Sequence, residues 1–73
     1  MKTRLSPLYI DGARLQELRE EANLSREALA RRAHLSHRTV FRIEKGQTKQ
    51  VHELTLMALA GALGVETHEL LER

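Results

Sequence analysis

The link between two short helical patterns restricts the fold of this chain more than any other feature of its sequence. The first pattern begins at Ser25 and the second at Ser36, and serine is one of the residues that cap helix N-termini. Only His34 and Leu35 separate the end of the first pattern, near Ala33, from the second serine. A link this short forces the second helix across the first at a sharp angle, so that it projects from the body of the domain.

Similar signals predict three more helices. Asp11 caps the first helix, and further helices are expected over residues 51–63 and, as a short turn or helix, 66–71. β-Branched residues are scattered and never alternate, which argues against a sheet. The sequence therefore predicts an all-α fold, a compact cluster of five helices in which residues 36–45 form the third. The apolar residues expected to face inward are Leu15, Leu18, Ala22, Leu29, Ala30, Ala33, Val40, Phe41, Ile43, Leu56, Leu59, Ala60 and Leu63, and the last segment carries Leu70 and Leu71.

The predicted helix ends carry residues that tolerate a left-handed backbone. Asn23 is expected to end the first helix in this conformation, as asparagine does where glycine is absent. Gly46 and Gly64 follow the third and fourth helical patterns and are expected to stop them.

Length and composition limit the class of protein. Seventy-three residues make one domain, and the absence of cysteine excludes disulfides, thiolate zinc sites and a cysteine nucleophile. Residues 1–10 contain Ser6-Pro7 and no periodicity, which predicts an N-terminal arm, partly disordered over residues 1–5, ahead of a domain over 11–73. No apolar run approaches the roughly 18 residues of a membrane span, so we expect a cytoplasmic protein without a membrane partner.

Positive charge is concentrated in the middle of the chain. The net charge is only +2, but residues 24–49 hold seven Lys and Arg against two Glu. Such a patch is typical of a polyanionic partner, although composition alone would favour a solvated surface. His37, Arg38 and Arg42 share the exposed side of the 36–45 helix, and arginine has two donors that match O6 and N7 of guanine in the major groove. These three residues are the candidates for reading DNA bases.

Other polar residues around this helix suit DNA phosphates. Hydroxyls in the first turn, lysines after the helix and an arginine at the start of the preceding helix are donors of the kind that contact the DNA backbone. If the N-terminal arm is not disordered, its Lys2 and Arg4 could make a supplementary contact with DNA. The candidate phosphate-binding residues are Arg26, Ser36, Thr39, Lys45 and Lys49.

The stretch LSREALARRAHLSHRTVFRIEKG resembles the helix-turn-helix of the Cro/C1-type (Xre-like, lambda-repressor-like) DNA-binding domains. It fits their pattern of Leu-Ser-x-x-x-Leu-Ala, a turn, and Ser-x-x-x-Val/Ile-x-x-Ile/Leu-Glu-x-Gly. LQELREEANLS is similar to the first helix of that family, and LTLMALAGALGVETHELL is similar to its fourth and fifth. The resemblance covers about residues 12–71 and implies a DNA-binding domain whose partner is a double-stranded operator.

The resemblance also implies roles for single residues. It places Arg26 at a phosphate-contacting position and the three candidates named above at base-reading positions. It pairs an arginine of the first helix with the glutamate that closes the third, here Arg19 and Glu44, as a structural ion pair. Two positions depart from the pattern. His34 replaces the usual glycine and must adopt a left-handed conformation or relax the turn, and Val51 replaces a common proline.

Metal-binding and catalytic alternatives have less support. His34 and His37 are three residues apart, but a metal site needs three or four ligands, and neither His52 nor His68 is tied to that pair. The carboxylates are spread as helix-surface charge, and the sequence has no nucleophile–base constellation or glycine-rich phosphate loop. We therefore expect no enzymatic activity, no metal and no cofactor.

The sequence favours a sequence-specific transcriptional regulator, most simply a repressor, that reads the major groove with residues 36–45. A single short helix reads few base pairs, so we expect a homodimer on a two-fold operator, with a self-contact near Leu70 and Leu71. One alternative is an antitoxin-like protein that binds a toxin partner and regulates its own operon. Another is the DNA-binding half of a larger repressor.

Overall fold

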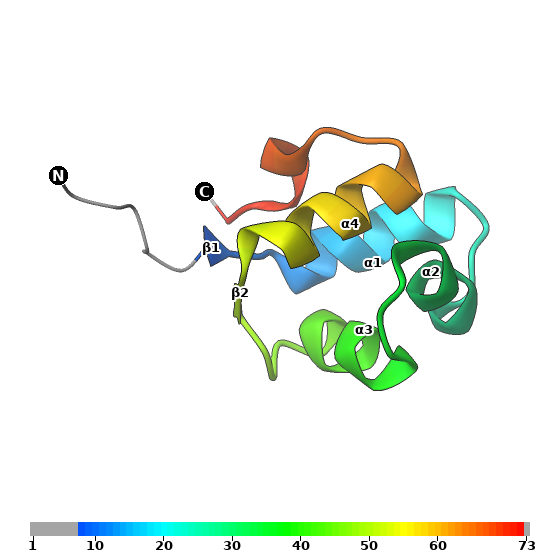
Figure 1. The fold of residues 1–73 in the computed structure, drawn as a ribbon, viewed down its shortest axis with the longest axis horizontal. Helices are drawn as coiled ribbons and strands as arrows, with labels where there is room; N and C mark the ends of the chain where they lie inside the picture. Colours follow the sequence, from blue (N-terminus) through cyan, green and yellow to red (C-terminus); the bar gives the residue numbers. More distant parts are fainter. Residues whose placement is uncertain (1–7, 73) are drawn as a thin grey trace, which may run out of the picture.

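The structure, a computed structural model, describes residues 8–72 (Figure 1). These residues form four α-helices, one 3-10 helix and two short strands, and none of the helices has the length and hydrophobicity needed to cross a bilayer. The mostly helical fold agrees with the prediction, but the last predicted helix is only a 3-10 turn and the strands were not expected. In chain order the elements are β1 (Leu8–Tyr9), α1 (Gly12–Glu21), α2 (Arg26–Ala33), α3 (His37–Glu44), β2 (Gln50–Val51), α4 (Glu53–Leu63) and η1 (Thr67–Leu70).

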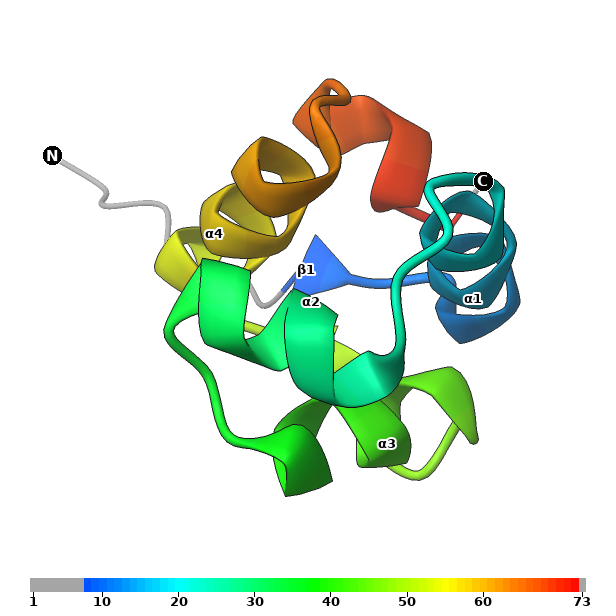
Figure 2. The same ribbon diagram turned by 90° about the vertical axis from the view of Figure 1, so that its right-hand side faces the viewer.

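The helices surround one hydrophobic core. In the view of Figure 2, α4 and α1 lie on opposite sides, α3 closes the lower end and η1 the upper end. α2 packs against both α3 and α4. Every helix contributes at least one completely buried leucine or isoleucine, so the core joins all five. The largest fully buried side chains are Ile10, Leu15, Leu29, Val40, Ile43, Leu59 and Leu70.

Ala22, Phe41 and Leu70 behave differently from the expectation. Ala22 is exposed because it follows the last residue of α1, where the side chain no longer faces the core. Phe41 is only half-buried, at the edge of α3. Leu70 is completely buried within its own domain, so the prediction that it takes part in a self-contact is wrong.

The segment that precedes α1 is partly integrated into the fold. β1 pairs antiparallel with β2, with Leu8 opposite Val51. Ile10 is 1% exposed, and it forms a bridge with Leu71 near the other end of the chain. Leu8 and Ile10, which the sequence assigns to an arm, therefore contribute to the core or pack against it, whereas Tyr9 between them is exposed. The predicted disorder of residues 1–5 and the suggested contacts of Lys2 and Arg4 lie outside the described residues.

The loop before α4 also differs from the expectation. Val51 is a buried strand residue, not the first residue of the fourth helix, which begins at Glu53. The pairing with β1 holds Val51 in an extended conformation, and this long-range contact outweighs the local helical pattern.

All four α-helices end in the same way. The residues Asn23, His34, Gly46 and Gly64 have φ values of 60°, 58°, 76° and 72°. In each case the next residue donates its N–H to a carbonyl five positions earlier, for example Leu35 to Ala30 at 2.8 Å. This is the Schellman motif, which satisfies carbonyls at a helix C-terminus. The left-handed conformation predicted for Asn23 is thus present, and of the two alternatives for His34 the structure shows the left-handed conformation.

Candidate nucleic-acid interface

α3 is fixed to the rest of the domain at its start, middle and end. The Ser36 Oγ accepts a hydrogen bond from the backbone N–H of Thr39 at 3.1 Å and caps the helix. Val40 and Ile43 are completely buried on its inner side. Gly12 of α1 approaches the Ile43 backbone so closely that a Cβ there would overlap the carbonyl oxygen. The outer side of α3 is left facing solvent.

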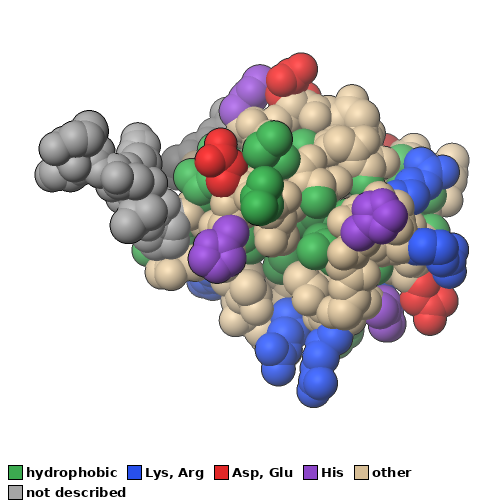
Figure 3. Space-filling model, in the orientation of Figure 1, with side chains coloured by type: hydrophobic (Ala, Val, Ile, Leu, Met, Phe, Trp, Pro, Cys, Tyr) green, Lys and Arg blue, Asp and Glu red, His purple; other side chains and the backbone are tan. Residues whose placement is uncertain are grey.

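The outer side of α3 is basic. His37, Arg38 and Arg42 have exposed side chains, as does Lys45 immediately after the helix. In Figure 3, Lys and Arg side chains project from the lower end of the molecule, which Figure 1 shows to be the end formed by α3. Its eight residues make α3 about 12 Å long. That length is similar to the width of the major groove, about 12 Å.

The candidate phosphate-binding residues lie around this surface. Lys45 and Lys49 are exposed, and Thr39 is half-buried. The hydroxyls of Ser36 and Thr39 are hydrogen-bonded to each other at 2.8 Å. One hydroxyl donates in that bond, so the hydrogen of the other is left to donate elsewhere.

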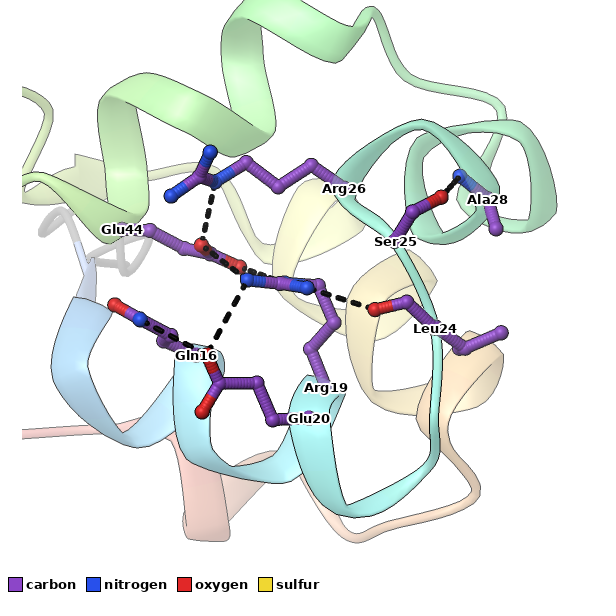
Figure 4. Close-up of polar contacts among 8 residues, drawn as sticks. All are labelled: Gln16, Arg19, Glu20, Leu24, Ser25, Arg26, Ala28 and Glu44. Atoms are coloured by element: carbon purple, nitrogen blue, oxygen red, sulfur yellow. Dashed lines mark hydrogen bonds and ion pairs between the residues drawn. The ribbon is translucent and has the colours of Figure 1, made fainter.

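Arg19 and Glu44 form an ion pair inside the domain (Figure 4). The Arg19 Nε donates to Glu44 Oε2 at 2.6 Å, and Nη2 donates to Oε1 at 3.1 Å. The Glu44 side chain is 0% exposed and that of Arg19 is 10% exposed. Nη1 of Arg19 donates to the carbonyl of Leu24 at 2.7 Å. The pair therefore joins α1, α3 and the turn that leads into α2.

Glu44 also accepts a hydrogen bond that the sequence did not reveal. Arg26, the first residue of α2, donates from Nε to Glu44 Oε1 at 2.9 Å. Its side chain is 27% exposed, and no hydrogen bond joins its two terminal nitrogens to residues 8–72. Arg26, expected only as a phosphate contact, thus belongs to an internal network that also reaches the surface. The two arginines share the Glu44 carboxylate, and Glu20 adds a second carboxylate 3.9 Å from Nη2 of Arg19 (Figure 4).

Phe41 lies beside two cations. The guanidinium carbon of Arg26 is 5.1 Å from the centroid of the ring, and Nζ of Lys45 is 5.7 Å from it. Both distances are within the roughly 6 Å at which an aromatic face attracts a cation. The helical pattern predicts Phe41 as a core residue. Its actual neighbours depend on the angle between α2 and α3, which no spacing in the sequence reveals.

Other surface features lie on a different side of the molecule. Within residues 8–72, no three His, Asp or Glu side chains are grouped closely enough to hold a metal ion. Leu54 and Met57 of α4 are 78% and 50% exposed, and Figure 3 shows hydrophobic side chains gathered there. Beside them is an open pocket of about 390 Å³, lined by Leu8, Glu53, Leu56, Met57, Thr67 and Leu71.

Comparison with known proteins matches residues 15–70 to the helix-turn-helix family model HTH_3. A protein of Methanothermobacter thermautotrophicus, named as an HTH-type transcriptional regulatory protein, is 41% identical over 58 residues. The match covers 80% of this chain and 18% of that protein, so the chain spans less than a fifth of this relative's length.

Two solved structures share the fold over most of the chain. The restriction-modification controller protein C.AhdI from Aeromonas hydrophila is 40% identical with a TM-score of 0.75, covering 80% of this chain and 86% of that one. The complex of the SinR and SinI proteins gives 26% identity and a TM-score of 0.80, covering 85% of this chain and 60% of the other. In both, the similarity extends well beyond α2 and α3.

Proposed function

The chain belongs to the helix-turn-helix family HTH_3, of the Cro/C1 type, and we propose that it is a transcription regulator that binds double-stranded DNA. The observation that carries this proposal is the exposed basic side of α3, a helix whose opposite side is completely buried. The name of the 41% identical relative, a transcriptional regulatory protein, supports it.

In this proposal α3 enters the major groove and its outer side reads bases. Arg38 and Arg42 donate to O6 and N7 of guanine, and His37 donates to a base acceptor at the start of the helix. The fixed position of α3 favours this role, because a bidentate contact discriminates between bases only when its donors are held in place.

The remaining polar residues would hold the DNA backbone. The free hydrogen of the Ser36–Thr39 hydroxyl pair, together with the ammonium groups of Lys45 and Lys49, suits phosphate oxygens on either side of α3. Arg26 adds the two terminal nitrogens that its bond to Glu44 leaves available. These contacts set affinity and register, and they carry no base preference.

We also propose that the regulator acts as a homodimer and represses by covering a promoter. α3 has eight residues and reads few base pairs, so a two-fold operator would double the sequence that is recognised. Since Leu70 is buried, the exposed apolar side chains of Leu54 and Met57 are the better candidates for the self-contact. The same proposal includes a cytoplasmic location.

Selection of bound duplexes from a random DNA pool tests the proposal. The chain should enrich a shared motif arranged as an inverted repeat. A variant that combines Arg38→Ala and Arg42→Ala should lose that motif, whereas Arg31→Ala with Arg32→Ala, which removes two exposed arginines from α2, should keep it. Enrichment of no duplex above the input would refute the proposal.

A second candidate function is binding to a protein partner, such as the toxin of an antitoxin-like pair. The exposed Leu54 and Met57 beside the open pocket favour it, and one similar structure is a complex of two different proteins. Two measurements would separate the two candidate functions. Co-purification of the chain with a co-expressed neighbouring protein would favour the protein-binding function, whereas tight DNA binding by the chain alone would favour the regulator.

A further inference from the structure

Phe41 is a half-buried aromatic residue at the edge of a basic surface. Its ring centroid lies 5.1 Å from the guanidinium carbon of Arg26 and 5.7 Å from Nζ of Lys45. Lys45 follows Phe41 by one helical turn, but Arg26 comes from a different helix, α2. The ring therefore brings together two cations that the sequence keeps apart.

Arg26 is held from two sides. Its Nε donates to Glu44 Oε1 at 2.9 Å, and its guanidinium lies against the Phe41 ring. Neither contact uses the two terminal nitrogens, which make no hydrogen bond within residues 8–72. A guanidinium fixed in this way presents a fork of donors whose geometry matches two oxygens of a phosphate.

The charges around this point do not balance. Arg19, Arg26 and Lys45 carry three positive charges around this point, against the two carboxylates of Glu44 and of Glu20, which lies 3.9 Å from Nη2 of Arg19. Like charges brought together repel, so gathering them opposes folding unless they are compensated. An approaching anion would supply the missing compensation, and the exposed atoms of Arg26 and Lys45 are the ones that could meet it.

We propose that Phe41 is a positioning residue for DNA binding, whose ring holds Arg26 and Lys45 as a paired site for phosphates of one DNA backbone. The proposal rests on the DNA-binding function argued above and adds to it the residue that orders these two contacts. Long cationic side chains lose conformational freedom when they bind, and ordering them beforehand reduces that cost. Because phosphates carry no sequence information, the effect is the same for every duplex.

Phe41→Leu removes the ring and Phe41→Tyr keeps it. In fluorescence anisotropy titrations, Phe41→Leu should weaken binding by about three- to tenfold on specific and random duplexes alike. Phe41→Tyr should bind as the wild type does. In a background of Arg26→Ala with Lys45→Ala, Phe41→Leu should have no further effect, since the residues through which it acts are absent. Thermal melting establishes that each variant is folded at the assay temperature, and Phe41→Met, which fills a similar volume, replaces Phe41→Leu if that variant is not.

A readout without DNA separates this inference from the proposed function. In NMR spectra, the ring current of Phe41 should shift the side-chain protons of Arg26 and Lys45, and Phe41→Leu should abolish the shift while Phe41→Tyr preserves it. If the wild type binds DNA and Phe41→Leu binds equally well, the positioning role is wrong. It is also wrong if Phe41→Leu loses the same factor in the doubly substituted background, because the ring would then contact DNA directly. A wild type that binds no duplex would instead overturn the proposed function itself.

Discussion

The buried carboxylate of Glu44 accepts hydrogen bonds from two arginines while its side chain is completely shielded from water. Removing a charged group from water costs several kcal/mol, and in a protein this cost is offset only when the group is fully hydrogen-bonded. Arg19 supplies two of the three bonds and Arg26 the third. Glu44 at the last residue of α3 is therefore one of the side chains that hold this helix in position.

Arg19→Ala should lower the free energy of unfolding by about 3–5 kcal/mol, because Glu44 would keep only its bond to Arg26. Urea denaturation followed by circular dichroism measures this loss. Arg14→Ala is the matched control on the same helix, since it removes surface ion pairs with Glu17 and, at 3.9 Å, with Glu69, each worth about 1 kcal/mol or less. Equal losses in the two variants would show that the buried pair contributes no more than a surface pair.

Arg38→Ala should abolish discrimination at one base position of the operator, at a cost of about 1–3 kcal/mol for the preferred base. Competition binding with single-base variants of the selected duplex measures this change. Lys49→Ala, which removes an exposed loop cation, should weaken all duplexes by a similar factor and reduce the dependence of affinity on salt. An unchanged ranking of duplexes in Arg38→Ala would remove this residue from the base-reading set.

Among the helices, α1 and α3 are joined by a backbone contact as well as by side chains. Gly12 opens α1 directly against the Ile43 carbonyl near the end of α3. The absence of a side chain at this position is what lets the two helices approach. The orientation of the basic surface thus depends on a residue that makes no contact with it.

Gly12→Ala should destabilise the domain and weaken DNA binding, because the new Cβ overlaps backbone atoms that cannot move without shifting α3. We expect a loss of about 1–3 kcal/mol, the usual cost of overpacking. Gly61→Ala in α4 is the control, since nothing lies within 4 Å of the added Cβ. Its higher helix propensity should stabilise the domain by about 1 kcal/mol. The melting temperatures of the two variants should therefore change in opposite directions.

Local signals in the sequence predicted the helices well. The serine caps Ser25 and Ser36 and the left-handed residues Asn23 and His34 act within a few residues of their own positions, so the amino-acid order determines them. The exposure of the outer side of α3 followed from the same reasoning. The spacing of residues along the chain was sufficient to predict these features.

Contacts between distant segments could not be predicted in this way. Ile10 follows β1, which pairs with β2, and itself forms a bridge with Leu71, and nothing in residues 1–10 indicates these contacts. The contact between Arg26 and Phe41 could not be predicted from the sequence for the same reason. Whether they meet depends on how α2 crosses α3, and side-chain geometry decides whether Arg26 then reaches Glu44.

For the domain as a unit, the proposed dimer makes a geometric prediction. Two copies of α3 should read half-sites whose centres are about 34 Å apart, one turn of B-DNA. Native mass spectrometry of the selected duplex should then show two chains per duplex. Insertion of about half a turn, five base pairs, between the half-sites should reduce the complex to one chain. Two chains on the lengthened duplex would show that the copies bind independently.

The pairing of β1 with β2 and Leu71 also bears on how the domain folds. These contacts join residues that are far apart in the sequence, and Ile10 and Leu71 lie near its two ends, whereas the packing of α2 on α3 joins neighbours. Closing a long loop is entropically costly, so the helix pairs should form first and the strand contacts last. Ile10→Ala should then speed unfolding in stopped-flow experiments and leave the refolding rate nearly unchanged. The strand pairing would set the lifetime of the folded state, while the local helix contacts set the rate at which it forms.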